Sequence, residues 1–308
     1  MKTIAKLLVV AGVVLAAGVA ETSAESDRPA VLVCSPNGTW DPRVDLNWLK
    51  ELKQRGWEPD YLDNHGDFTW ERIKRYNVLV LYGCPPERRG QAHTFGYPNR
   101  PPYQPEYLAL IERYLEAGGG VFCMAYVHNG DEGIRAMIQP WGVRLPLEVY
   151  IEEDPNKIAP IPRMRGHERV ALVDQVLPSP ISDGVRRLWM PYSRSYNTSW
   201  TAPVQFSDDW HVVVRGSKTS RSEPVDLSQS TIPAPPDALI RPEGVKEPDL
   251  IAIRSYRKGR LFFACQWPQF TVGQGTAWLY DRVVLSKGAK GIPSGPGVVL
   301  LVLCRSSR

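Results

Sequence analysis

The chain has 308 residues, of which 43% are hydrophobic and 23% charged, and its formal net charge is +4. So small a charge argues against a dedicated nucleic-acid-binding protein, which needs a basic patch. The chain has five widely spaced cysteines, and an odd number cannot all be paired with one another. A chain of this length also does not need disulfides for stability, so a disulfide framework is not expected.

The first 24 residues have the three-part pattern of a secretory signal peptide. Lys2 and Lys6 give a basic start, residues 7–20 are apolar, and small residues at 22–24 suit a signal peptidase. The apolar run is shorter than the roughly 20 residues of a spanning helix, and a retained N-terminal anchor is the alternative. We therefore expect an exported protein, periplasmic or extracellular, without a membrane span after signal removal.

Between residues 30 and 142, apolar runs alternate with amphipathic segments. The runs at 30–35 and 77–84 lack polar alternation, as expected of strands buried on both faces. Repeated strand–helix units predict a flavodoxin-like, doubly wound, mostly parallel α/β sheet with helices on both faces and strand order 2-1-3-4. The expected strands are 30–35, 58–63, 77–84 and 121–126, and the expected helices lie between Asp41 and Gly56 and at 70–76, 106–117 and 132–141.

From about residue 145 the chain is dense in proline, and 145–250 reads as an elaborated, irregular region. Residues 217–247 read as an exposed Ser/Pro-rich excursion, and the acidic run 152–154 as a solvated loop. Residues 286–308 form a tail, either a last edge strand or a non-native end. The expected strands are Arg169–Val173, His211–Arg215, Leu250–Ser255 and Arg260–Gln266, with a hairpin turn at Lys258-Gly259.

The stretch GGGVFCMAYVHNGD at 118–131 predicts a tight turn, a buried strand and a polar elbow that could carry a nucleophile. Cys123 lies between Phe122 and Met124, so we expect it to be packed, with the pKa of its thiol raised rather than lowered. Cys34 and Cys84 end strands that are neighbours in the 2-1-3-4 order. A disulfide between these two cysteines is therefore an alternative to two free thiols.

These elements resemble the class I glutamine amidotransferase-like superfamily. The resemblance is carried by NVLVLYGC, a helix, a glycine turn, VFCMAYVHN and a short helix that ends in WGV. In active members the strand leads into a Gly-x-Cys-x-Gly elbow whose Cys is the nucleophile. Here that position falls on Ala125, and the flanking glycine positions fall on Cys123 and Val127. The resemblance therefore implies a degenerate domain that is not a glutamine amidotransferase.

Within the superfamily, the chain is more similar to the trehalose-utilisation (ThuA-like) proteins, which are not amidotransferases. LPSPISDGV at 177–185 resembles their HPI-x-x-GL segment, with Ser179 in place of His, and RKGRLFF at 257–263 resembles GKGRVF. The Gly-His that usually follows is replaced by residues 266–269. The likeness covers about 30–270 and implies a single amidotransferase-like α/β domain over 25–285.

Ligands of an open parallel sheet bind beyond the carboxyl ends of its strands. The loops expected there carry aromatic, amide, carboxylate and imidazole side chains that suit a sugar or another small molecule. The sequence has no dedicated metal-ligand spacing and no phosphate-binding glycine motif, so we expect neither metal nor cofactor. The candidate ligand-binding residues are Asn37, Trp40, His65, Tyr126, His128, Asn129, Asp131, Trp267 and Gln269.

Three functions follow from these observations. The leading hypothesis is a non-catalytic binding or scaffold protein, with carbohydrate as the candidate ligand. The second is an enzyme of carbohydrate metabolism that uses polar residues at the carboxyl ends of the strands; the sequence does not assign its catalytic residues. The third is a cysteine hydrolase or amidotransferase acting through Cys123 or Cys84, which requires an accessible thiolate.

Overall fold

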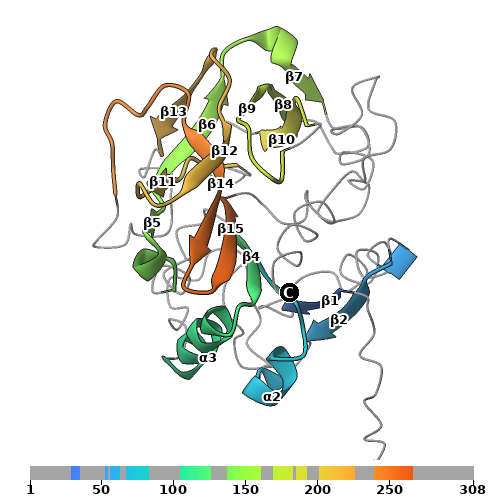
Figure 1. Cartoon of the computed structure of the whole chain (residues 1–308). Coiled ribbons are helices and arrows are strands. Elements are labelled where there is room, and N and C mark those ends of the chain that lie inside the picture. The colour runs from blue at the N-terminus through green and yellow to red at the C-terminus, as the bar shows by residue number, and fades with distance from the viewer. Residues whose placement is uncertain are drawn as a thin grey trace, which may run out of the picture.

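In the residues that it describes, a computed structural model of the chain has a central eight-stranded sheet and three smaller sheets (Figure 1). The strands of the central sheet follow the order β2-β1-β3-β4-β15-β14-β12-β9. The structure describes residues 29–34, 53–54, 56–62, 67–82, 105–125, 137–160, 169–182, 185–192, 201–225 and 239–265.

Five neighbouring strands of the central sheet are parallel. They are β1 (Ala30–Cys34), β2 (Glu58–Leu62), β3 (Val78–Tyr82), β4 (Gly120–Ala125) and β15 (Gly259–Cys265). Their order confirms the predicted arrangement 2-1-3-4 and the flavodoxin-like α/β class. All five carboxyl ends therefore lie at one edge of the sheet, which we call the carboxyl edge.

The other strands of the central sheet are β14 (Asp249–Tyr256), β12 (His211–Arg215) and β9 (Gln175–Val176), each antiparallel to its neighbour. The β14–β15 hairpin turns at Arg257-Lys258, one residue before the predicted position. Arg257 adopts a left-handed φ of 54°, and its guanidinium pairs with Glu112 at 2.8 Å and Glu116 at 3.1 Å. These ion pairs tie the hairpin to helix α3 (Pro105–Glu116).

Two helices flank the parallel strands in the described residues, α2 (Trp70–Ile73) and α3 (Pro105–Glu116). Helix α3 buries Ile111, Tyr114 and Leu115 against the sheet, as its amphipathic pattern predicts. The helix expected between Asp41 and Gly56 lies almost wholly outside the described residues. The helix expected at 132–141 is described only from residue 137, where residues 137–138 are α-helical and are followed by a 3-10 turn, η2 (Gln139–Trp141), ended by left-handed Gly142.

In the described residues, the second half of the chain contributes three small antiparallel sheets (Figure 1). The prediction that residues 217–247 form an exposed excursion is partly wrong. Strand β13 (Ser220–Pro224) lies within this range, and Ser217, Ser220 and Ser222 are buried. The pairs are β5 (Val143–Arg144) with β11 (Gln205–Phe206), β6 (Glu148–Glu152) with β13 (Ser220–Pro224), and β8 (Arg169–Val173) with β7 (Ile158–Pro160) and β10 (Leu188–Tyr192).

Both faces of the central sheet are buried, which explains why its strands show no polar alternation. One face packs on α3 and Trp141. On the other face, Phe122 and Phe262 stack with ring centroids 4.4 Å apart, and second-half residues such as Tyr150 and Met190 cover them. In the described residues, strands therefore cover the face on which helices were expected. No described helix is long and apolar enough to cross a membrane.

Candidate functional site

The predicted elbow contains a buried thiol rather than an exposed nucleophile. Cys123 lies inside β4, fully buried, with Leu81 and Phe263 as its register neighbours. The strand ends two residues later at Ala125, the position where the resemblance expects the nucleophile. The prediction that Cys123 is a core residue is confirmed.

The thiol of Cys34 is also buried, at the end of β1 in the same row of side chains as Leu81 and Cys123. Burial raises the pKa of the Cys34 thiol well above its ordinary value, so this thiol stays protonated. Cys34 is a free thiol in the structure. Cys84 lies outside the described residues, and its pairing with Cys34 stays a prediction.

The nine ligand-binding residues predicted from the sequence all lie outside the described residues. The strands that lead into them end together, because Cys34, Leu62, Ala125 and Cys265 are the last residues of parallel neighbours. Their expected meeting at the carboxyl edge stays a prediction. The residues are Asn37, Trp40, His65, Tyr126, His128, Asn129, Asp131, Trp267 and Gln269.

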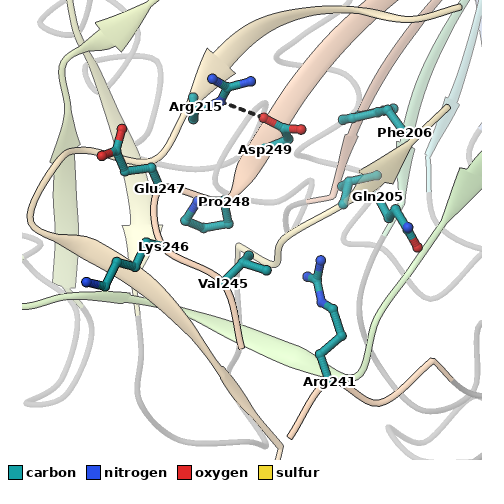
Figure 2. A pocket seen from close by; sticks show the side chains of 10 residues that line it. Gln205, Phe206, Arg215, Arg241, Val245, Lys246, Glu247, Pro248 and Asp249 are labelled. Carbon is teal, nitrogen blue, oxygen red and sulfur yellow. Dashed lines mark hydrogen bonds and ion pairs between the residues drawn. The ribbon is translucent and has the colours of Figure 1, made fainter. Parts of the chain in front are cut away.

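A pocket of about 400 Å³ opens at the same edge of the sheet (Figure 2). Strand β14 is antiparallel to β15, with Ile251 opposite Ala264, so its first residue, Asp249, lies near the carboxyl end of β15. Arg215 ends β12 directly opposite Asp249. We call this cavity the edge pocket, and its lining comprises Val204, Gln205, Phe206, Arg215, Arg241 and residues 245–249.

Two ion pairs involve side chains that line the edge pocket. Arg241 donates from Nε and Nη2 to the carboxylate of Glu148, with Nη2 at 2.6 Å from Oε2. Glu148 is fully buried, whereas the Arg241 side chain is 24% exposed. Arg215 Nε donates to Asp249 Oδ1 at 2.8 Å. In Figure 2 the Arg241 guanidinium points into the space between Gln205 and Val245.

Backbone hydrogen bonds hold the segment 244–249 that forms one wall of the pocket. Val204 N donates to Asp249 O at 2.9 Å, and Gly216 N donates to Pro248 O at 2.7 Å. Further along, Val245 is bonded to β13 through Ser222, whose backbone N–H donates to Val245 O at 2.8 Å. The wall is therefore fixed to three other parts of the chain before any ligand arrives.

Gly244 allows the closest approach in this wall, and we predict that Gly244→Ala destabilises the fold. Its φ is +62°, and a Cβ atom would lie 2.1 Å from the backbone O of Ser222. Left-handed strain and the clash together should lower the free energy of unfolding by about 2–3 kcal/mol in urea denaturation.

Gly56→Ala is the matched control, because Gly56 has φ +83° and no described atom within 4 Å of the added Cβ. This control should lose only about 1–2 kcal/mol, from left-handed strain. Equal losses in both variants would mean that the contact between Gly244 and Ser222 does not hold the wall.

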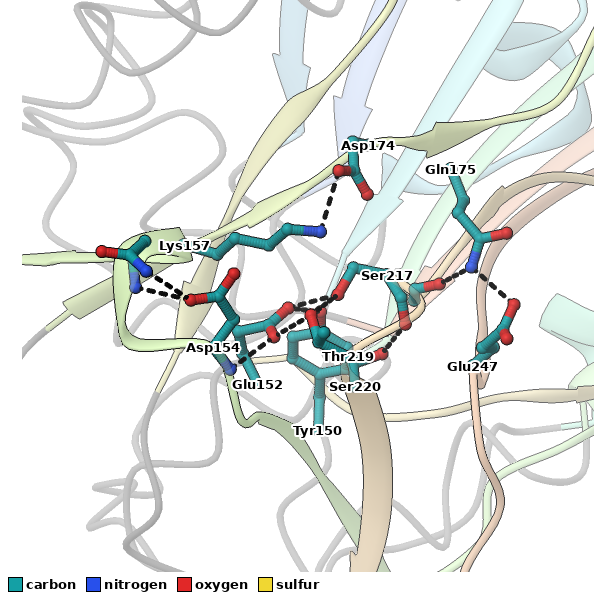
Figure 3. Close-up of polar contacts among 12 residues, drawn as sticks. Tyr150, Glu152, Asp154, Lys157, Asp174, Gln175, Ser217, Thr219, Ser220 and Glu247 are labelled. Carbon is teal, nitrogen blue, oxygen red and sulfur yellow. Dashed lines mark hydrogen bonds and ion pairs between the residues drawn. The ribbon is translucent and has the colours of Figure 1, made fainter.

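A second polar cluster surrounds Glu152 at the end of β6 (Figure 3). Thr219 Oγ1 donates to Glu152 Oε1 at 2.6 Å, Asp154 N donates to the same oxygen at 3.0 Å, and Ser217 Oγ donates to Oε2. Tyr150 Oη donates to Oε2 at 3.4 Å, and burial raises the pKa of this phenol, so it remains a donor.

The expectation of a solvated acidic run at 152–154 is wrong for Glu152, which is fully buried. The hydroxyl-rich turn between β12 and β13 supplies the donors that make this burial tolerable. Glu153 does face solvent, and Asp154 caps the 3-10 turn η3 (Pro155–Lys157) by accepting from Asn156 N at 2.9 Å.

The Glu152 cluster connects to the edge pocket through Gln175. The Gln175 Nε2 group donates to Gly216 O and, at 2.7 Å, to Oε2 of Glu247 in the pocket wall. Ser217 is fully buried with its hydroxyl on a carboxylate, so it is not placed to act as a nucleophile. The cluster is therefore a support for the pocket rather than a reaction centre.

Ser179, at the position where the sequence resemblance to ThuA-like proteins expects His, stabilises a turn. Its Oγ accepts from Ser182 N at 3.1 Å, and Ser182 Oγ donates to Leu177 O at 2.7 Å. His211 lies against the same turn, with Nε2 at 2.7 Å from Pro178 O. Among the described residues, no group of three or more His, Cys, Asp or Glu side chains could hold a metal ion.

Sequence reasoning missed the pocket residues Gln205, Arg215, Arg241 and Asp249. The sequence-based prediction placed the site only in loops that follow parallel strands, whereas the pocket is lined by the start of an antiparallel strand at the same edge. The predicted hairpin turn at Lys258-Gly259 was the available signal, because it places the start of the strand at 250–255 near the end of the strand at 260–266.

No family profile and no curated protein matches this chain. Among solved structures, the mmIFT52 N-terminal domain aligns over 85% of this chain and 100% of its own, with 13% identity and a TM-score of 0.50. The likeness is one of fold. A ThuA-like protein from Parabacteroides merdae aligns over 87% of this chain and 97% of its own, with 12% identity and a TM-score of 0.43. A cytoplasmic protein of Salmonella typhimurium LT2 aligns over 83% of this chain and 98% of its own, with 14% identity and the same TM-score.

Proposed function

We propose that this chain is an exported, non-catalytic binding or scaffold protein built on a degenerate amidotransferase-like domain, with carbohydrate as its candidate ligand. One observation carries the proposal: Cys123 is fully buried within β4, and the strand ends at Ala125, whose side chain carries no nucleophilic group. A cysteine nucleophile must be an accessible thiolate. Neither position can supply one, so the amidotransferase reaction has no nucleophile at this elbow.

The edge pocket supports the binding part of the proposal. Its volume of about 400 Å³ lies within the range of small-molecule sites. Arg215 and Asp249 form an ion pair with each other, and Arg241 is paired with Glu148 behind the pocket. Side chains paired in this way can still hold a ligand by hydrogen bonds through their remaining donor and acceptor atoms.

Thiol labelling tests the non-catalytic character. In the folded protein, iodoacetamide should modify Cys34 and Cys123 at least about 100-fold more slowly than after denaturation, because alkylation requires opening of the core. Peptide mass spectrometry separates these two cysteines from the other three. Glu71→Cys is the positive control, because the Glu71 side chain is 75% exposed.

Rapid alkylation of Cys123 at neutral pH, comparable to that of the exposed control, would contradict the proposal and revive the cysteine hydrolase hypothesis. Turnover of a bound saccharide by the purified protein would instead support the alternative of an enzyme of carbohydrate metabolism. Slow labelling without turnover is the result that we expect.

A further inference from the structure

The charged side chains of the edge pocket cancel one another. Arg215, Arg241 and Lys246 carry three positive charges, and Glu247, Asp249 and the buried Glu148 behind Arg241 carry three negative charges. A ligand with a net charge would find no surplus of the opposite charge to compensate its lost hydration. The pocket is therefore matched to a neutral ligand.

Several hydrogen-bonding atoms of the pocket remain available to such a ligand. In the part of the chain that the structure describes, Glu148 uses only Nε and Nη2 of Arg241, and Arg215 uses only Oδ1 of Asp249. Arg241 Nη1 is left as a donor, Asp249 Oδ2 as an acceptor, and the exposed amide of Gln205 as both. Hydroxyl groups, which donate and accept, can pair with all three.

Apolar surface lies beside these polar atoms. Phe206 lines the pocket and is held by Trp210 at 5.2 Å and by Phe263 at 6.1 Å between ring centroids. Val204, Val245 and Pro248 add aliphatic surface. A ligand with hydroxyls on its rim and C–H groups on its face fits this lining better than a wholly polar or wholly apolar one.

The donor group of Arg241 is positioned before binding. A fully buried carboxylate holds two of its nitrogens, which fixes the plane of the guanidinium, and Figure 2 shows this guanidinium between Gln205 and Val245. Side chains fixed in this way lose little conformational entropy when a ligand binds. Glu148 is thus a positioning residue for the pocket.

We infer that the edge pocket binds a neutral polyhydroxylated ligand of the size of a mono- or disaccharide, with Arg241, Asp249 and Gln205 as its hydrogen-bonding residues. This inference rests on the proposed binding function, to which it adds a site and a ligand class. It differs from the sites predicted in the loops after the parallel strands.

Calorimetric titration with glucose, maltose and cellobiose tests the inference, with glucuronate and glucosamine as charged analogues. We expect a neutral saccharide to bind more tightly than its charged analogues. Gln205→Ala and Asp249→Asn should each weaken that binding about tenfold or more, through loss of one or two hydrogen bonds. The matched controls Gln54→Ala and Asp208→Asn replace exposed residues outside the pocket and should leave it unchanged.

Each of the other outcomes would contradict a specific part of the inference. Binding that neither Gln205→Ala nor Asp249→Asn weakens would exclude this pocket while leaving the proposed binding function intact. Tighter binding of glucuronate or glucosamine would exclude the neutral ligand class. Absence of binding by all three neutral saccharides to the folded protein would overturn the inference, whereas the non-catalytic proposal is tested separately by thiol labelling. Thermal unfolding of each variant shows whether it remains folded.

Discussion

Replacement of Arg241 by Met is expected to lower the free energy of unfolding by about 3–5 kcal/mol. Glu148 has no exposed side-chain surface, and Arg241 is the cation that pairs with it. The substitution leaves a buried carboxylate without compensation, although the aliphatic part of the side chain is retained. Urea denaturation followed by fluorescence should show a lower midpoint with an unchanged slope.

Two further variants identify the cause of this loss. Arg221→Met removes a cation from a surface cluster, where Arg221 is 39% exposed beside Glu153, and should cost less than about 1 kcal/mol. The double variant Glu148→Met/Arg241→Met removes both charges and should recover most of the lost stability. A loss for Arg241→Met no larger than for Arg221→Met would mean that Glu148 is hydrated rather than buried.

Replacement of Glu152 by Ala should destabilise the protein by a similar amount, about 3–5 kcal/mol. The carboxylate accepts from Ser217, Thr219, Tyr150 and the backbone N–H of Asp154. Removing it leaves buried donors without an acceptor, which costs more than the hydrogen bonds themselves contribute. Glu152→Gln keeps one carbonyl acceptor and should lose roughly half as much.

Glu153→Ala is the matched control for Glu152→Ala. Glu153 is the next residue, and its side chain is 54% exposed in an ion pair with Arg221. Its loss should stay below about 1 kcal/mol in the same denaturation experiment. Similar losses at both positions would show that the hydroxyl-rich turn does not depend on the buried carboxylate.

Much of the fold follows from local patterns. The parallel sheet was predictable because uninterrupted apolar runs such as β1 and β3 alternate with helix signals, and the order 2-1-3-4 is the one that the expected flavodoxin-like class implies. The bounds Arg169–Val173 and His211–Arg215 were predicted as observed. The burial of Cys123 followed from its apolar neighbours. In each case the signal lies within a few residues of the element it describes.

The candidate site was not predictable in the same way. Arg241 and Glu148 are 93 positions apart, and Ser217 and Glu152 are 65 apart. A Ser/Pro-rich stretch and an acidic run are each typical of solvated loops, so the sequence pattern pointed away from burial for both. Burial becomes favourable only when these two segments contact each other, because each satisfies the hydrogen-bonding groups of the other.

The sequence by itself determined the parallel sheet and the burial of Cys123, since hydrophobic periodicity and residue identity are local properties. The tertiary structure alone decided that Glu148 and Glu152 are buried and that Arg215, Arg241 and Asp249 meet at the carboxyl edge. The physical reason is that burial of a charge depends on partners, and these partners come together only when distant strands pair.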